Sequence, residues 1–146
     1  MTEDQATAGR SLRILLIDDD DLVRKAVARM LVHGGHAVTA VPGLREAKAV
    51  LRTLPLDLVV TDVYMPDADG LEVLQLVRQE HPSLPVIVIS GRFAADTFGK
   101  SLMMSMRKLG AAGTLAKPVT PSSILACVEE VMAGRVLCSA PDAPAT

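Results

Sequence analysis

Five short aliphatic runs alternate with longer amphipathic stretches, and this alternation limits the possible folds more than any other feature of the chain. The aliphatic runs lie at residues 13–17, 37–41, 58–61, 86–89 and 113–115. Each run is followed by a stretch with apolar residues at helical spacing. Strands that alternate with helices are typical of βαβ units. We therefore predict an α/β fold built on a five-stranded, mainly parallel sheet.

The predicted helices are bounded by residues that begin or end helices. Their apolar stripes fall at residues 23–31, 44–54, 71–77, 98–109 and 124–132. Gly34 with Gly35 is expected to end the first helix and Pro55 the second, while Pro121 fits the first turn of the last. Residues 1–11 and 135–146 lack the periodicity. We expect one domain over residues 12–134 between two flexible tails.

Composition excludes several classes of protein. A chain of 146 residues with 49% hydrophobic and 22% charged residues is typical of one globular domain. Its net charge of -2 and lack of a strongly basic stretch argue against direct binding of nucleic acid. We find neither an apolar run of roughly 18 residues nor a signal peptide, so we expect a cytoplasmic protein without membrane insertion. Cys127 and Cys138 lack a framework pattern and are expected to be ordinary thiols.

The residues that follow the predicted strands could build a phosphoryl site. In an open α/β sheet, ligands bind beyond the carboxyl ends of the strands. Four acids at residues 18–21 follow the first run, Asp62 the third, Ser90 the fourth and Lys117 the fifth. We expect Asp20 or Asp21 to cap the next helix. A helix cap explains one of these acids but not four in succession.

These residue types suit metal-assisted phosphoryl chemistry. Asp19 and Asp62 offer the oxygen ligands that Mg²⁺ prefers, and a bound cation would relieve the repulsion between packed carboxylates. Asp62 could also act as a nucleophile and carry an aspartyl-phosphate. Ser90 and Lys117 would then hold the phosphoryl oxygens by a hydrogen bond and by charge. Lys117 precedes Pro118, where a cis peptide bond is possible and a trans bond is commoner.

Four motifs occur in a familiar order. They are Ile14-Leu-Leu-Ile-Asp-Asp-Asp-Asp-Leu-Val-Arg24, Thr61-Asp-Val-Tyr-Met-Pro-Asp-Ala-Asp-Gly-Leu71, Ile87-Val-Ile-Ser-Gly91 and Lys117-Pro118. With these motifs, roughly residues 12–134 resemble the receiver domain of two-component response regulators, here of the stand-alone type. The resemblance implies a doubly wound, flavodoxin-like parallel sheet in the order 2-1-3-4-5 with helices on both faces.

The resemblance also implies a role for each polar residue. Asp62 would accept a phosphoryl group, Ser90 would be the switch hydroxyl and Lys117 the charge partner. Mg²⁺ would be bound by Asp18, Asp19, Asp62 and the backbone carbonyl of Tyr64. The phosphodonor would be a histidine kinase or a histidine phosphotransfer protein, and the output would run through protein contacts. The chain would then catalyse only its own phosphorylation and dephosphorylation, so we do not expect an enzyme with a separate substrate.

The chain departs from the family outside these chemical positions. Thr114 stands three residues before the lysine, where receivers usually carry Tyr or Phe, and Val119 stands where Phe is common. The 26 residues between Ser90 and Lys117 are a few more than usual and include Met103, Met104 and Met106. A methionine cluster at helical spacing is more often core than partner surface. We hypothesise that phosphorylation signals by displacing this longer segment, over residues 92–109.

Two other functions stay open on the sequence. One is a receiver-fold binding module that acts without phosphorylation, which Thr114 and the long segment favour and the complete set of polar residues opposes. The other is a small Mg²⁺-dependent phosphohydrolase that works through an aspartyl-phosphate. Such an enzyme would need a second acid two residues after the nucleophile, where this chain has Tyr64, and a substrate-covering insert, for which the chain is too short.

Overall fold

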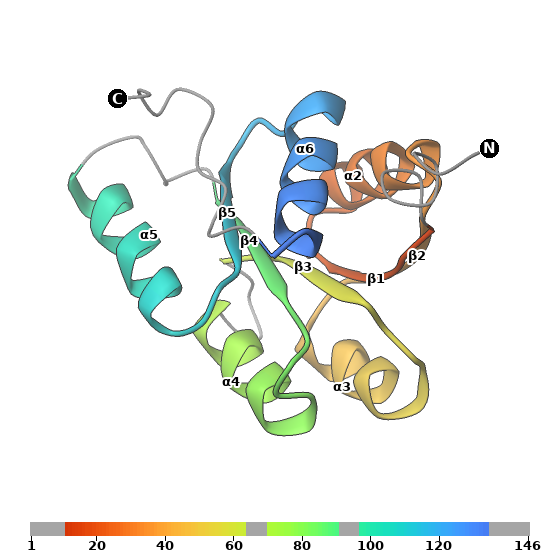
Figure 1. Ribbon diagram of the computed structural model, residues 1–146, viewed down its shortest axis with the longest axis horizontal. Coiled ribbons are helices and arrows are strands. Elements are labelled where there is room, and N and C mark those ends of the chain that lie inside the picture. The colour runs from red at the N-terminus through yellow and green to blue at the C-terminus, as the bar shows by residue number, and fades with distance from the viewer. Residues whose placement is uncertain (1–10, 64–69, 91–96, 135–146) are drawn as a thin grey trace.

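The fold is the predicted doubly wound α/β sheet (Figure 1). The computed structural model describes residues 11–63, 70–90 and 97–134, apart from seven side chains at 70, 97–100, 102 and 103 whose surroundings are not described. Its strands are β1 (Arg13–Ile17), β2 (Ala37–Val41), β3 (Leu58–Asp62), β4 (Val86–Ser90) and β5 (Gly113–Ala116). All four strand pairs are parallel, and the order is β2-β1-β3-β4-β5, as the resemblance implies. The predicted tails lie outside the described residues, except for Ser11.

Helices cover both faces of this sheet. They are α2 (Asp21–His33), α3 (Leu44–Thr53), α4 (Gly70–Glu80), α5 (Thr97–Lys108) and α6 (Pro121–Met132). Helices α2 and α6 lie together on one face, and α3 and α4 lie on the other (Figure 1). Helix α5 packs beside β5 at one edge. In the described part of the chain, no helix is long and apolar enough to cross a membrane.

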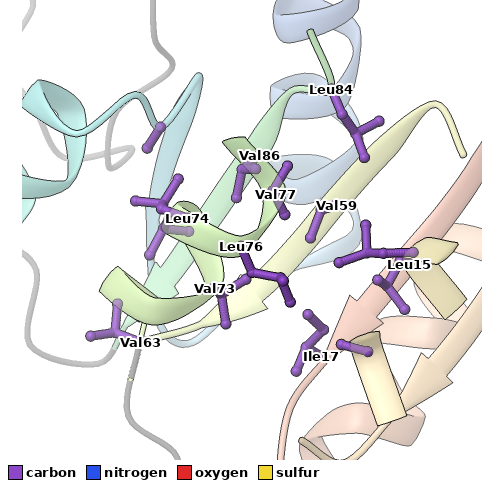
Figure 2. Packing of buried hydrophobic residues seen from close by; sticks show 14 of the residues in the cluster. Leu15, Ile17, Val59, Val63, Val73, Leu74, Leu76, Val77, Leu84 and Val86 are labelled. Carbon is purple, nitrogen blue, oxygen red and sulfur yellow. The ribbon is translucent and has the colours of Figure 1, made fainter. Parts of the chain in front are cut away.

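Alternate residues of the strands feed two separate apolar cores. Leu15, Val59 and Val86 join α3 and α4 in one cluster, while Ile14 and Leu16 join α2 and α6 in the other. Figure 2 shows side chains of β1, β3 and β4 meeting those of α4 in the first cluster. Strands β3 and β4 are buried at every position because helices cover both faces, which explains their aliphatic sequences.

The helix ends follow the predicted signals. Asp20 is the N-cap of α2, and its carboxylate accepts hydrogen bonds from the amides of Leu22 and Val23. Gly34 is the C-cap of α2, and Gly35 has a φ of 96°, a left-handed conformation that glycine adopts without steric cost. Helix α3 ends before Pro55, and Pro121 opens α6. The sequence therefore places the turns that return the chain to the sheet.

The sulfur-containing residues give mixed outcomes. Met106 is buried in the core, whereas Met104 is 57% exposed on the same helix, so the methionine cluster is divided between core and surface. The side chain of Met103 lies outside the described residues.

Cys127 is disulfide-bonded, so the expectation of an ordinary thiol was wrong for it. Lack of a framework pattern excludes a network of bridges but does not exclude a single bridge. Cys138 lies outside the described residues.

His36 makes the stability of the sheet depend on pH. It lies at the amino ends of the strands, away from the acidic residues. Its Nδ1 accepts a hydrogen bond of 3.2 Å from the amide of Leu12, which requires a neutral ring. Burial lowers the pKa of His36, and the charge of Glu129 opposes this shift in part. A lowered pKa means that the unfolded chain binds the proton more readily than the folded one. The contribution of His36 to stability is therefore present above about pH 6.5 and is lost as the pH falls below that value.

We predict that His36→Gln makes the free energy of unfolding depend less on pH between about 5 and 7, the range in which a histidine titrates. Urea denaturation at a series of pH values measures this dependence. His33→Gln is the matched control, because His33 is exposed at the end of α2. An unchanged pH dependence in His36→Gln would show that this histidine has no such role.

Candidate metal and phosphoryl site

The parallel sheet brings the predicted polar residues together at the carboxyl ends of its strands, which we call the acidic edge. Asp18 directly follows β1, Asp62 ends the neighbouring β3, and the register pairs Ile17 with Thr61 just before them. Ser90 ends β4, which lies on the other side of β3. Lys117 follows β5, and its backbone amide donates a 3.0 Å hydrogen bond to the carbonyl of Ser90. Four separate segments of the sequence therefore meet, as the strand pattern predicted.

Three carboxylates at this edge are close enough to share a cation. Asp18, Asp19 and Asp62 each offer an oxygen, and these three oxygens lie within 4.8 Å of one another. Asp18 and Asp62 are buried, with 3% and 8% of their surface exposed, while Asp19 is open to solvent. An all-oxygen donor set that is partly open to water fits the coordination preferences of Mg²⁺. Tyr64, whose carbonyl was the fourth predicted ligand, lies outside the described residues.

Lys117 supplies the positive charge that faces two of these acids. Its Nζ lies 3.3 Å from Oδ2 of Asp62 and 3.6 Å from Oδ2 of Asp18. Its side chain is 25% exposed, so the ammonium group sits at the boundary between the pocket and solvent. The peptide bond between Lys117 and Pro118 is cis, the isomer that the sequence allowed as the less common outcome. The lysine lies at the two acids, where the sequence predicted it.

The two buried acids are held in an unfavourable electrostatic state. Burial raises the pKa of Asp62, and the charge of Asp18 raises it further, while Lys117 acts in the opposite direction. Burial also raises the pKa of Asp18, against the amide of Asp20 and the charge of Lys117. Desolvation and like-charge repulsion both disfavour ionised carboxylates. A bound divalent cation would offset both effects, so the residues present fit such an ion.

Main-chain hydrogen bonds fix the direction of each buried carboxylate. Oδ1 of Asp62 accepts a 2.8 Å hydrogen bond from the amide of Val63, which leaves Oδ2 facing Lys117. Oδ1 of Asp18 accepts a 2.9 Å hydrogen bond from the amide of Asp20. The hydroxyl of Thr61 donates to the carbonyl of Asp62 at 2.9 Å. The acids are therefore oriented by the backbone before any ligand binds.

Two further positions that the sequence singled out lie inside the protein. Ser90 is fully buried at the end of β4, next to the strand that carries Asp62. Thr114 is also fully buried, and it pairs with Val88 in the β4–β5 register. The place of the usual aromatic residue is thus taken by a small side chain inside the protein.

Sequence reasoning missed Arg24, which contacts both ends of the turn between β1 and α2. Its guanidinium donates to the backbone carbonyl of Asp18 at 2.9 Å and to a carboxylate oxygen of Asp21 at 2.6 Å. The spacing of three residues on a helix could have predicted the pair with Asp21. No sequence signal points to the bond with the Asp18 carbonyl, because that contact depends on how the turn folds.

The comparisons with known proteins agree with this arrangement. The sequence model for the response regulator receiver domain matches residues 14–129. The chain belongs to this family. The match includes residues of every strand and both buried acids, so the sheet and the acidic residues at its carboxyl edge both lie within the matched region.

The chain is similar to parts of longer proteins and to nearly the whole of a shorter one. The chain is 35% identical to the response regulator protein FleR of Pseudomonas aeruginosa over 90% of its own length, and 34% identical to the transcriptional regulatory protein QseB of Haemophilus influenzae over 85%. It spans 27% of FleR and 54% of QseB. The high-resolution structure of the chemotaxis response regulator CheY4 of Vibrio cholerae superposes with a TM-score of 0.73 at 26% identity, covering 84% of this chain and 99% of that one.

Proposed function

We propose that this protein is a phosphorylation-controlled switch of a two-component system. Asp62 accepts a phosphoryl group from a histidine kinase or a histidine phosphotransfer protein, with Mg²⁺ bound at the acidic edge. The phosphorylated form then acts through contacts with other proteins. The observation that carries the proposal is the placement of Asp62, a buried carboxylate that faces Lys117 beside two further acids in a receiver fold.

Asp62 suits nucleophilic attack on a phosphoryl group. Its Oδ1 is held by the amide of Val63, and its Oδ2 faces the ammonium of Lys117. In the transfer, a carboxylate oxygen of Asp62 forms a bond to phosphorus while the bond from phosphorus to the donor atom breaks, and the electron pair stays on the donor. Mg²⁺, when bound by Asp18, Asp19 and Asp62, would neutralise charge on the phosphoryl oxygens.

Lys117 and Ser90 would act on the transferred group. The ammonium of Lys117 lies 3.3 Å from Asp62 and would neutralise a phosphoryl oxygen. The hydroxyl of Ser90 would move to donate a hydrogen bond to another phosphoryl oxygen. Because Ser90 lies on β4, the strand beside β3, this movement would reach the rest of the sheet. Attack by water on phosphorus would release inorganic phosphate and restore the carboxylate. The protein then modifies only itself and has no separate substrate.

The first test uses a small phosphodonor, because it needs no knowledge of the kinase. We expect incubation with acetyl phosphate and Mg²⁺ to add the mass of one phosphoryl group to the intact protein. Asp62→Asn is expected to gain none, and omission of Mg²⁺ is expected to abolish the gain in the parent. Asp57→Asn is the matched control, since Asp57 pairs with Arg13 away from the acidic edge. A gain in Asp62→Asn equal to that of the parent would place the acceptor elsewhere.

A second candidate function is a receiver-fold binding module that works without phosphorylation. The buried Thr114 favours this candidate, because it stands where receivers usually carry an aromatic residue and a threonine has no ring that could swing inward. Failure of the folded, Mg²⁺-binding protein to gain mass would support this candidate. Mass gain that alters binding to a partner would exclude it.

A further inference from the structure

Arg24 makes contacts that a surface arginine on a helix does not need. Its side chain is only 16% exposed, and it turns back from the first turn of α2 toward the end of β1. One guanidinium nitrogen donates to the carbonyl of Asp18 and another to the carboxylate of Asp21. The arginine therefore joins the two ends of the turn that links β1 to α2.

That turn carries two of the three acids at the candidate metal site. Asp18 is anchored on both sides, because its carboxylate accepts from the amide of Asp20 while its carbonyl accepts from Arg24. Asp19 follows directly and is exposed, and within the described part of the chain no recorded hydrogen bond or ion pair holds its carboxylate. The position of Asp19 therefore depends on the backbone on either side of it, which Arg24 and the Asp20 cap fix.

We propose that Arg24 is a positioning residue for the metal site: by holding the Asp18 carbonyl and the Asp21 carboxylate, it fixes the turn so that Asp18 and Asp19 converge with Asp62. This inference rests on the proposed function, because it assigns Arg24 a part in binding the Mg²⁺ that phosphorylation requires. Arginine is suited to this part, since its planar group offers donors in a fixed fork.

The charge of Arg24 alone would have the opposite effect. The positive charge of Arg24 repels a divalent cation bound by Asp18 and Asp19, so removal of that charge alone would strengthen Mg²⁺ binding. Loss of the two hydrogen bonds would loosen the turn and weaken binding. Lysine keeps the charge but cannot reproduce the fork, whereas methionine removes both. Arg24→Lys and Arg24→Met therefore separate positioning from charge.

The experiment measures Mg²⁺ affinity by calorimetry in the parent, Arg24→Lys, Arg24→Met and Arg29→Met. Arg29 is exposed on the same helix, so its replacement matches the change in net charge without touching the turn. We expect both Arg24 variants to bind Mg²⁺ about tenfold more weakly, the low end of the effect of residues that hold metal ligands in place. Arg29→Met is expected to bind like the parent. Circular dichroism at the same temperature checks that each variant is folded.

Two further readouts distinguish positioning from a general loss of stability. Amide exchange at Asp20, whose amide donates to Asp18, is expected to quicken in the metal-free Arg24 variants and not in Arg29→Met. The Mg²⁺ concentration for half-maximal phosphorylation by acetyl phosphate is expected to rise, while the rate at saturating Mg²⁺ stays close to that of the parent.

Each outcome decides the matter. Weaker binding in both Arg24 variants supports positioning. Parent-like affinity in Arg24→Lys overturns it, and tighter binding in Arg24→Met as well assigns the effect of Arg24 to its charge alone. Failure of the parent itself to bind Mg²⁺ overturns the proposed metal site, and the role of Arg24 with it. Parent binding with no difference among the variants overturns the role of Arg24 alone.

Discussion

Replacing Lys117 with Met is expected to slow the phosphorylation of Asp62 by acetyl phosphate about a hundredfold to a thousandfold, the usual cost of removing one group that stabilises transition-state charge. The ammonium of Lys117 lies 3.3 Å from Asp62, and methionine keeps most of the volume of the lysine without its charge. The transferred phosphoryl oxygens would then lack a positive partner on the side of the pocket that faces β5.

The same substitution is expected to strengthen Mg²⁺ binding. Lys117 lies within 4 Å of two carboxylates that belong to the candidate metal site, so its ammonium competes with the metal for them. Loss of the lysine removes this competition. The rate of phosphorylation and the affinity for Mg²⁺ therefore move in opposite directions, which simple damage to the fold would not produce.

Intact-mass time courses at saturating Mg²⁺ measure the rate, and calorimetry measures the affinity. Lys48→Met is the matched control, because Lys48 is exposed on α3 and loses the same charge. It is expected to match the parent in both measurements. A Lys117→Met variant that phosphorylates at the parent rate would remove the lysine from the chemistry. One that loses both rate and Mg²⁺ affinity would show that the lysine holds the pocket together.

The strands and their ends could be predicted because their signals are local. Strands β3 and β4 are buried on both faces, so their aliphatic runs stand out, and each ends one residue later than predicted, at Asp62 and Ser90. Both end residues are polar and buried, and a search for aliphatic runs stops at the residue before each of them. The helix caps were equally local, since Asp20 and Gly34 are residue types that favour those positions.

Other features depend on contacts between distant segments and were not predictable. The order of the strands came from resemblance, because periodicity does not say which strands are neighbours. The contact of Arg24 with the Asp18 carbonyl exists only once the β1–α2 turn has formed. The division of Met104 and Met106 between surface and core depends on how α5 lies against β5, whereas both satisfy the same apolar periodicity.

Asp18→Asn is expected to stabilise the metal-free protein while weakening Mg²⁺ binding about a hundredfold, the upper end for changes around metal ligands because a ligand charge is itself lost. Burial and neighbouring acids raise the pKa of Asp18, so its ionised form at neutral pH is unfavourable in the folded state. Asparagine removes the charge and keeps an oxygen that can accept the hydrogen bond from the amide of Asp20. We expect the free energy of unfolding to rise by about 1 kcal/mol.

The pH dependence of this gain has a definite sign. A carboxyl whose pKa is raised in the folded state destabilises the protein increasingly as the pH rises above the unfolded value of about 3.9. The advantage of Asp18→Asn is therefore largest near neutral pH and shrinks as the pH is lowered toward about 4. Urea denaturation across this range, without metal, measures it. An advantage that stays constant with pH would mean that the charge of Asp18 is not its source.

Addition of Mg²⁺ should reverse the ranking of the two proteins. A ligand that binds only the folded state stabilises it in proportion to the logarithm of its concentration over its dissociation constant. The parent is therefore expected to gain more in melting temperature than Asp18→Asn as Mg²⁺ is raised, until it becomes the more stable of the two. Asp57→Asn again serves as control, since Asp57 is an acid paired with Arg13 outside the acidic edge. Equal gains in the parent and Asp18→Asn would exclude Asp18 from the metal site, whereas a reversal would mean that this buried acid costs stability when the site is empty and supports Mg²⁺ binding when it is filled.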